Sequence, residues 1–292
     1  MNENLPVTKW SAKECRRALV VPTSLDHKYS HGVIGMITGS AQYPGAAVLT
    51  THAAMATGVG MIRFYPPSEY WEWQALRMID QLVLARSPEV VIHPGKVSAW
   101  LLGSGIPAKG IGGYKTRSRH RDFRKASKQS VPMILDAGAL YLSGTFSTPT
   151  LITPHVGELA DLLNSRGISV TSSAIEGDPK KWLQVAVGVL NVSVLLKGST
   201  TYLADDARVI ELPEATPWLA TAGTGDVLAG IIGALLATNS VALAHGDITI
   251  TEIGATGAMI HAMAAYEASA GGPFSASRIC DFIPSVVRKL FS

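Results

Sequence analysis

The sequence is poor in cysteine, in charge and in long apolar runs. Its two cysteines, Cys15 and Cys280, lie near opposite ends of the chain and show no paired spacing with histidines. We therefore expect neither a disulfide framework nor a zinc site. The longest apolar run, Val227–Ala237, is too short to cross a bilayer, and residues 1–10 lack the basic start and apolar core of a secretory signal. These absences predict a cytoplasmic protein with no membrane partner.

Apolar residues are abundant. Hydrophobic types make up 47% of the 292 residues and charged types only 16%. A chain of this size can bury one large core, and no segment resembles a hinge between two cores. We predict a single domain over residues 1–292, of which residues 1–25 form an N-terminal extension. The composition fits a central sheet buried on both faces, or an oligomer that hides additional surface.

Short β-branched runs alternate with helical stretches along the chain. Val33–Thr38 predicts a buried strand, Ala46–Thr57 a helix of small residues, and Val59–Tyr65 a second strand, which together make a βαβ unit. Five further strands are expected at Trp100–Gly103, Met133–Leu135, Leu151–Thr153, Val192–Leu196 and Thr201–Ala204. Two further helices are expected at Ile248–Ala270 and Ser277–Phe291. This alternation predicts an α/β fold with a mostly parallel central sheet, helices on both faces, and functional residues at the carboxyl ends of the strands.

The net charge of +3 hides a basic segment. Residues 115–128 contain seven lysines and arginines and one acid, Asp122. Such a patch can attract nucleic acid or another anion. However, its arginines alternate around Phe123, which is typical of the solvated face of a helix, and no aromatic platform or reading helix accompanies the charge. We therefore predict a solvated helix and no nucleic-acid partner.

The most informative segment is Thr221–Ala237, which reads TAGTGDVLAGIIGALLA. Gly223 and Gly225 allow a tight turn at the start of an apolar helix, where unpaired amides and the positive dipole end bind anions. Asp226 lies in the first turn of this helix and can act as a cap. A cap does not need the preceding Gly-Thr-Gly, so we predict a carboxylate base beside a phosphoryl group in transfer.

Two other loops that contain glycine follow expected strands. In residues 39–47, GSAQYPGAA, the glycines permit close backbone approach and Ala46 leaves room above a helix start, which suits a small-molecule site or an ordinary βα turn. Residues 103–108, GSGIPA, match a relaxed dinucleotide fingerprint, but Pro107 lies inside the turn and no acid follows at a suitable position. We therefore reject a Rossmann domain, and the lack of a Gly-Lys-Ser/Thr triplet excludes a P-loop.

Polar residues at the ends of three further strands are also candidates. His155 lies between Pro154 and a helix start, where an imidazole can meet an anion, and Glu158 can neutralise the helix dipole or hold magnesium through water. Asp136 ends a buried strand, where its carboxylate caps a turn or orients a metal or water. Lys197 ends an apolar strand, where burial of its ammonium is costly without an anion. A phosphate is its expected partner, with snorkelling to solvent as the alternative.

Taken together, these segments resemble the NAD(P)H-hydrate dehydratases, whose fold is that of the ribokinase-like kinases. Five motifs occur in the order of that family: HKYSHGVIGMITGSAQYPGAA, PMILDAGAL, LITPHVGELADLL, VLLKGSTTYLAD and TAGTGDVLAGIIGALLA. The AGTGD loop indicates the ribokinase-like superfamily, whereas HKY, YPGAA and TPH with GE single out the dehydratases. The resemblance covers residues 27–291. It implies a three-layer α/β/α fold and an enzyme that repairs (6S)-NADHX or NADPHX, the hydrated forms of reduced nicotinamide nucleotides.

The resemblance also implies which residues bind the two substrates. The positions that bind the hydrate fall on Ala46, Gly103, Gly105, His155 and Asp226. The nucleotide site falls on Lys197, Gly198, Ser199, Thr200, Thr201 and Gly225. The co-substrate is ADP in most bacterial members and ATP in eukaryotic ones, and Mg²⁺ is expected to bridge its phosphates. The sequence departs from the family at Gly138 and Tyr141, where a second acid and an asparagine are usual, and at residues 103–105, where Gly-Pro-Gly is usual.

The implied chemistry uses phosphorylation to make dehydration easy. Asp226 takes the proton from the hydroxyl of the hydrate, the oxygen attacks the terminal phosphoryl group, and the amides from Gly223 to Gly225 stabilise the charge in transfer. Phosphate, a better leaving group than hydroxide, then departs. The alternatives are a vitamin-type kinase of the same superfamily, such as a hydroxyethylthiazole kinase, and a non-catalytic nucleotide sensor. Composition and family favour a homo-oligomer, a tetramer, that cooperates with an NAD(P)HX epimerase.

Overall fold

Parallel strands form the centre of the structure, a computed structural model that describes residues 5–66, 73–108 and 114–291. The strands make one nine-stranded sheet in the order β1-β9-β8-β7-β6-β5-β4-β2-β3. Strand β8 is antiparallel to both of its neighbours, and every other pair is parallel. The strands are β1 (Val7–Lys9), β2 (Val33–Ile37), β3 (Met61–Phe64), β4 (Ala99–Leu102), β5 (Met133–Leu135), β6 (Thr150–Ile152), β7 (Ser193–Leu196), β8 (Tyr202–Ala204) and β9 (Val209–Glu211).

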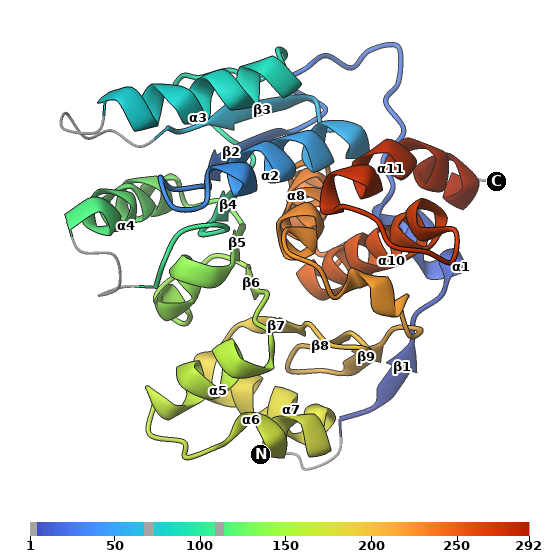
Figure 1. Ribbon diagram of the computed structural model, residues 1–292. Coiled ribbons are helices and arrows are strands. Elements are labelled where there is room, and N and C mark those ends of the chain that lie inside the picture. Colours follow the sequence, from blue (N-terminus) through green and yellow to red (C-terminus); the bar gives the residue numbers. More distant parts are fainter. Residues whose placement is uncertain (1–4, 67–72, 109–113, 292) are drawn as a thin grey trace.

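Helices cover both faces of this sheet (Figure 1). One face carries α1 (Ala12–Cys15), α2 (Pro44–Thr57), α3 (Trp73–Arg86), α8 (Thr224–Thr238), α10 (Ile250–Ser269) and α11 (Ala276–Phe291). The other face carries α4 (Tyr114–Ala126), α5 (Val156–Asn164), α6 (Ser172–Gly177) and α7 (Pro179–Leu190). The short helix α9 (Ser240–His245) and the 3-10 helices at Arg16–Ala18, Ser127–Gln129, Ala137–Leu142 and Pro217–Leu219 complete the described elements.

The alternation of side chains along the strands produces two apolar cores. In β2, Ile34 and Met36 belong to the core under α2 and α8, whereas Val33 and Ile37 belong to the core under α4 and α5. All five residues of this strand are buried, because helices cover both of its faces. The layered α/β fold predicted from the sequence is therefore confirmed.

The structure contains two strands, β1 and β9, that the sequence pattern does not predict. Strand β1, within the predicted N-terminal extension, pairs with β9 so that Val7 lies opposite Val209. Beyond this strand, Trp10 and Cys15 are buried in the core under α10 and α11. Both strands are three residues long, and short strands with little alternation give a weak signal in a sequence.

Parallel pairing brings the ends of the central strands to one edge of the sheet. The residues that directly follow β2, β4, β5, β6 and β7 are Thr38, Gly103, Asp136, Thr153 and Lys197. Ligands of open parallel sheets bind outside this carboxyl edge. The fold therefore gathers segments that lie far apart in the sequence into one neighbourhood.

Helix α8 is buried along most of its length on its face of the sheet. Every residue from Val227 to Ala237 is buried, and glycines in it allow close packing. A Cβ added to Gly230 would collide with the carbonyl oxygen of Thr50 in α2, whereas one added to Gly233 would make an ordinary contact at 3.6 Å with Ile34. The packing of α2 against α8 therefore depends on Gly230 and not on Gly233.

Gly230→Ala is expected to lower the free energy of unfolding by about 1–3 kcal/mol, because the added methyl group must push the two helices apart. Gly233→Ala is the matched control in the same helix. It should be neutral or stabilising by up to ~1 kcal/mol, because alanine favours a helix more than glycine does. Urea unfolding followed by circular dichroism measures both variants, and equal effects of the two would contradict this account of the packing.

Candidate functional site

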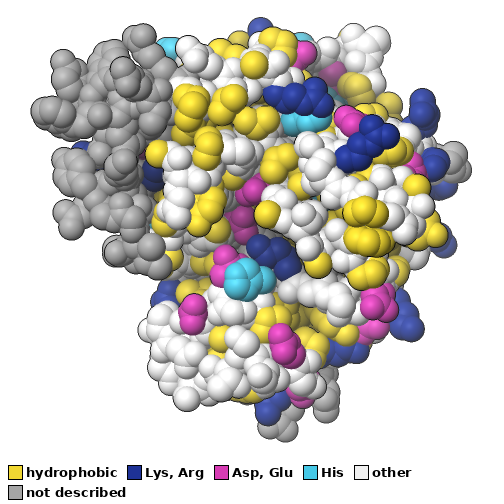
Figure 2. Space-filling view, in the orientation of Figure 1, with side chains coloured by type: hydrophobic (Ala, Val, Ile, Leu, Met, Phe, Trp, Pro, Cys, Tyr) yellow, Lys and Arg dark blue, Asp and Glu magenta, His cyan; other side chains and the backbone are white. Residues whose placement is uncertain are grey.

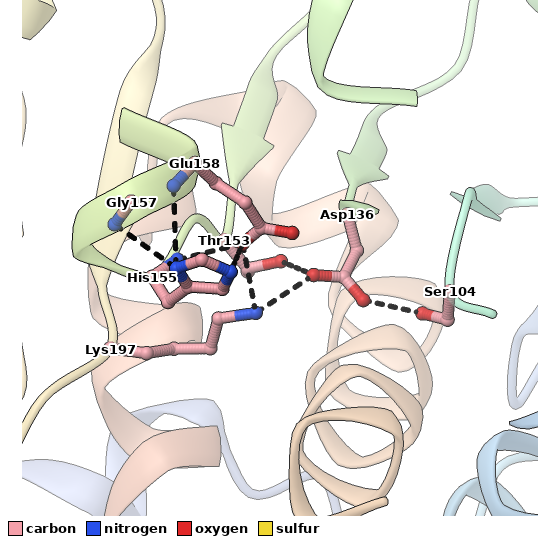
Figure 3. Close-up of polar contacts among 7 residues, drawn as sticks. All are labelled: Ser104, Asp136, Thr153, His155, Gly157, Glu158 and Lys197. Carbon is pink, nitrogen blue, oxygen red and sulfur yellow. Dashed lines mark hydrogen bonds and ion pairs between the residues drawn. The ribbon is translucent and has the colours of Figure 1, made fainter. Parts of the chain in front are cut away.

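A buried carboxylate at the end of β5 lies at the centre of the site (Figure 3). Asp136 is 4% exposed. Its Oδ1 accepts hydrogen bonds from the hydroxyl of Thr153 at 2.8 Å and from Nζ of Lys197 at 3.1 Å. Its Oδ2 accepts one from the hydroxyl of Ser104 at 2.8 Å. The four residues come from the ends of β4, β5, β6 and β7, so these contacts fix four neighbouring strand ends.

The ammonium of Lys197 lies between two carboxylates. Nζ is 3.1 Å from Oδ1 of Asp136 and 3.6 Å from Oε2 of Glu158. Burial by itself would lower the pKa of Lys197, but the two negative charges outweigh that effect and raise the pKa above its ordinary value. A Cβ added to Gly225 would lie 3.7 Å from Nζ. The charged ammonium therefore lies directly beside the start of α8.

The start of α8 presents peptide N–H groups that no side chain caps. Gly223, the N-cap residue, has a φ of 92°, a left-handed conformation that favours glycine. Within the described chain, no side chain caps this helix, whereas Thr249 caps α10 by accepting a hydrogen bond from the N–H of Glu252. The first amides of α8 and the positive end of its dipole are therefore available to an anionic group.

Asp226 lies half-buried in the first turn of α8. Burial raises the pKa of its carboxyl from 3.8 to about 7; the negative charge of Asp136 adds to the rise, and Lys197 opposes it. A carboxyl with a pKa near neutrality can accept and return a proton at neutral pH. The residue thus has the protonation behaviour of a general base.

His155 caps α5 with its own imidazole. Nδ1 accepts hydrogen bonds from the N–H groups of Gly157 at 3.1 Å and Glu158 at 3.3 Å, and the carboxylate of Glu158 accepts one from the N–H of His155 at 2.8 Å. The N–H groups at this helix start, beside which the sequence predicts that the imidazole can meet an anion, therefore donate to the imidazole itself. The side chain is 61% exposed, and its Nε2 lies 3.5 Å from Oε2 of Glu158. A contact between His155 and the hydrate stays a prediction.

A cavity of about 480 Å³ opens beside the start of α8. Its walls include five of the six residues predicted to bind a nucleotide, namely Lys197, Gly198, Ser199, Thr201 and Gly225, and Thr200 does not line it. Residues 214–217, 219 and 220 and the helices α8 and α10 form the rest of the wall. Figure 2 shows acidic side chains gathered in a hollow of the surface, with basic and histidine side chains beside them.

The turn at residues 103–105 and the turn at residues 39–46 contact each other and form another side of the site. Gly103 has a φ of 109°, and a Cβ there would collide with the carbonyl oxygen of Asp136. Gly105 has a φ of 65°, and a Cβ there would collide with the side chain of Ala46. The structure thus brings together Ala46, Gly103 and Gly105, three of the five residues that the resemblance implies for the hydrate.

Three residues near the site were not singled out from the sequence. Ser104 and Thr153 hold the carboxylate of Asp136, and each lies just after a buried strand. A hydroxyl residue in that position is a weak signal, because many such residues only cap turns. His261 lies on the cavity wall, where burial lowers its pKa to about 4 and leaves the imidazole neutral beside the main chain of Thr224. In the sequence, His261 is one residue of a long predicted helix, and no neighbouring motif marks it as a site residue.

The basic segment differs from the sequence prediction. Arg119 in α4 is 1% exposed, and Asp122 and Phe123 are buried as well, whereas Arg121 and Arg124 are exposed. The predicted solvated helix is therefore wrong for Arg119, whose guanidinium is buried because main-chain carbonyl groups accept its hydrogen bonds. The side chains of residues 114–118 lie outside the described residues.

The described part of the chain contains no group of three histidine, cysteine, aspartate or glutamate side chains arranged to hold a metal ion. The two carboxylates considered for magnesium, Asp136 and Glu158, flank the ammonium of Lys197. None of the described helices combines the length and the apolar character needed to cross a membrane.

The sequence matches the family model of the NAD(P)H-hydrate dehydratases over residues 34–283. The bifunctional NAD(P)H-hydrate repair enzyme Nnr of Mycobacterium tuberculosis H37Rv is 36% identical over 232 residues, which cover 75% of this chain and 43% of the relative. The chain thus spans about half the length of this curated relative.

Solved structures with the same fold include two bacterial proteins. The Bacillus subtilis ADP/ATP-dependent NAD(P)H-hydrate dehydratase, co-crystallised with ATP/Mg²⁺, has a TM-score of 0.78 at 22% identity and covers 98% of this chain and 99% of its own. A ribokinase-like superfamily protein from Enterococcus faecalis has a TM-score of 0.78 at 19% identity and covers 97% and 96%, respectively. These similarities confirm the predicted ribokinase-like fold.

Asp226→Asn is expected to stabilise the folded protein at neutral and alkaline pH. Because folding raises the pKa of Asp226 from 3.8 to about 7, ionisation of the carboxyl costs stability as the pH rises between these two values. The gain in unfolding free energy should be smallest below pH 3.8, grow with pH and level off above about 7, reaching ~1–3 kcal/mol. Urea denaturation at a series of pH values measures it, and a difference that does not vary with pH would contradict the raised pKa.

Proposed function

Because the chain belongs to the NAD(P)H-hydrate dehydratase family, we propose that it uses ADP or ATP to dehydrate NADHX and NADPHX and so restores NADH and NADPH. One observation carries the proposal. The start of α8, which no side chain caps, and Lys197 line one cavity, and Asp226, whose carboxyl has a pKa of about 7, lies in the first turn of the same helix. This arrangement supplies what phosphoryl transfer to a hydroxyl requires: an anion cradle, a base and a compensating charge.

Asp226 has the role of proton acceptor. Its carboxylate takes the proton of the hydroxyl on the hydrated nicotinamide ring while the hydroxyl oxygen attacks the terminal phosphorus of the nucleotide. The bond from that phosphorus to the bridging oxygen breaks, and the nucleotide leaves with one phosphate fewer. The new ester then loses phosphate together with a proton from the adjacent ring carbon, which restores the double bond of the dihydropyridine.

Negative charge on the group in transfer is stabilised by fixed positive groups. The peptide N–H groups from Gly223 to Gly225 point from the start of α8, and Lys197 adds a full charge beside Gly225. The donor set fits Mg²⁺ only with the help of nucleotide phosphates, since two carboxylates, Asp136 and Glu158, are the protein groups that would hold the ion or its water. When bound, Mg²⁺ neutralises charge on the phosphates.

The cavity beside Lys197 is the proposed nucleotide site. Five residues implied by the resemblance line it, and the ADP/ATP dependence named for the B. subtilis structure supports this choice of nucleotide. We further propose a cytoplasmic homo-oligomer, a tetramer, that works with an NAD(P)HX epimerase. The composition, with 47% hydrophobic and only 16% charged residues, supports the burial of further surface in such an assembly.

The test is a turnover assay with the purified chain, NADHX, Mg²⁺ and either ADP or ATP. The expected result is recovery of the near-ultraviolet absorbance of reduced nicotinamide, with one phosphate released for each molecule restored. A stable phosphate ester of hydroxyethylthiazole, formed without any recovery from NADHX, would support a vitamin-type kinase instead. Nucleotide binding without either product would support a non-catalytic sensor.

Asp226→Asn is expected to lower kcat by ~10²–10⁴-fold, because the amide keeps the size of the side chain and removes the base. The KM for the nucleotide should change only a few-fold, since the amides of α8 and Lys197 are unchanged. The exposed Asp206, changed to asparagine, is the control and should keep full turnover. A folded Asp226→Asn variant with near-normal kcat would exclude Asp226 as the base.

The pH dependence of kcat/KM for the hydrate should follow the ionisation of Asp226. Because the base must be ionised, the rate is expected to rise with pH and to level off above about 7. Initial rates at saturating nucleotide, measured from about one pH unit below this value to about one unit above it, give the profile. A rate that falls across this interval would contradict the assignment.

A further inference from the structure

The basic segment contains an arginine that the proposed function does not use. Arg119 lies in α4 and is 1% exposed. Its Nη2 donates to the carbonyl oxygen of Thr38 at 2.6 Å, and its Nη1 donates to that of Tyr65 at 2.6 Å. Nε and Nη2 both donate to the carbonyl oxygen of Gly39 at 3.3 Å. The guanidinium thus binds the chain directly after β2 and directly after β3.

A buried cation requires compensation. Burial lowers the pKa of Arg119 to about 10, and Asp122 and Asp80 act against that fall, so the guanidinium is charged at neutral pH. Its planar fork reaches three carbonyl oxygens on two loops at once, which a lysine ammonium, a single point of charge, cannot do in the same geometry. The contacts therefore join two loops rather than only attach α4 to the sheet.

The loop held by the guanidinium is bonded to the turn that the hydrate is expected to contact. Gly39 donates its N–H to the carbonyl oxygen of Ser104 at 2.8 Å, and Ser40 donates its hydroxyl to the carbonyl oxygen of Gly105 at 2.8 Å. Ala46 fills the space in which Gly105 would carry a side chain. A shift of the backbone at Gly39 would therefore move both walls of this part of the site.

We propose that Arg119 is a positioning residue for the hydrate pocket. By holding the carbonyl groups of Thr38, Gly39 and Tyr65, it keeps the turn at residues 39–46 against the turn at residues 103–105 in the shape that binds the nicotinamide hydrate. This inference rests on the proposed function, because the substrate of this part of the site comes from that proposal. It assigns a task to a residue that the sequence pattern placed on a solvated surface.

The effect should be confined to the hydrate. In the sheet, β7, which carries Lys197 and the nucleotide cavity, is four strands away from β2. At a spacing of about 4.8 Å between strands, that separation is about 19 Å. Between them, the ends of β4, β5, β6 and β7 are joined to one another by the side-chain hydrogen bonds of Asp136, which do not involve Arg119. Loss of the guanidinium should therefore weaken hydrate binding and leave nucleotide binding in place.

The experiment compares Arg119→Met, Arg119→Lys and the control Arg124→Met, which alters an exposed arginine of the same helix. For Arg119→Met we expect a rise of about 10-fold or more in the KM for NADHX at saturating ADP, because displaced pocket walls lose contacts with the hydrate that are the same in the bound state and the transition state. kcat and the KM for ADP should stay within about threefold. Arg119→Lys should give a smaller rise, and the control none.

The outcomes separate positioning from simple stability. An unchanged KM for NADHX in a folded Arg119→Met variant, or equal rises in both KM values, would overturn the inference, even if the melting temperature falls. If Arg119→Met does not fold, the lysine variant decides: a selective rise in the KM for NADHX supports the inference and a wild-type value overturns it. Failure of the wild-type chain to restore NADH from NADHX would instead overturn the proposed function.

Discussion

The hydrogen bonds of Asp136 decide the arrangement of the whole site. The strand ends of a parallel sheet have no further ladder partners, so the relative positions of their last residues depend on contacts between side chains. Here one carboxylate accepts from Ser104, Thr153 and Lys197, which follow three other strands. A buried carboxylate needs such donors, because an unpaired charge in the interior is costly. The donors that make its burial possible therefore also fix the distances among the functional groups.

Asp136 also couples the charges of its neighbours. Its negative charge raises the pKa of Lys197. Burial is the main cause of the raised pKa of Asp226; the charge of Asp136 raises that pKa further, and the charge of Lys197 lowers it. A nucleotide phosphate that enters beside α8 adds negative charge, and this would raise the pKa of Asp226 further and make it a stronger base but a less ionised one. Lys197 limits that loss of ionisation because its positive charge offsets part of the negative charge of the phosphate. Asp226, the proposed base, and Lys197 therefore influence each other's charge directly.

The sequence predicts most of the fold and part of the site, and the reasons differ from residue to residue. Buried strands such as β2 and β5 show as apolar runs, and Lys197 and Asp226 stand out because an ionisable residue at the edge of an apolar segment needs an explanation. The pairing of β1 with β9 is non-local and leaves no local pattern. Likewise, the sequence identifies His155 as a polar loop residue, but only the backbone path shows that its imidazole caps α5. The prediction of a solvated Arg119 is wrong because the spacing of arginines along a helix does not show which of them is buried.

The start of α8 lacks a stabilising side-chain cap that α5 and α10 have. α5 and α10 begin with capping boxes led by His155 and Thr249, and caps of this kind contribute about 1 kcal/mol each. α8 begins instead with Gly223, without a side-chain cap, and with a carboxyl whose ionisation is disfavoured. The helix tolerates this loss because its residues from Val227 to Ala237 are buried against the sheet and its neighbours. An anion bound at its start, as proposed for the nucleotide phosphate, would supply the missing cap, so its binding would also stabilise α8.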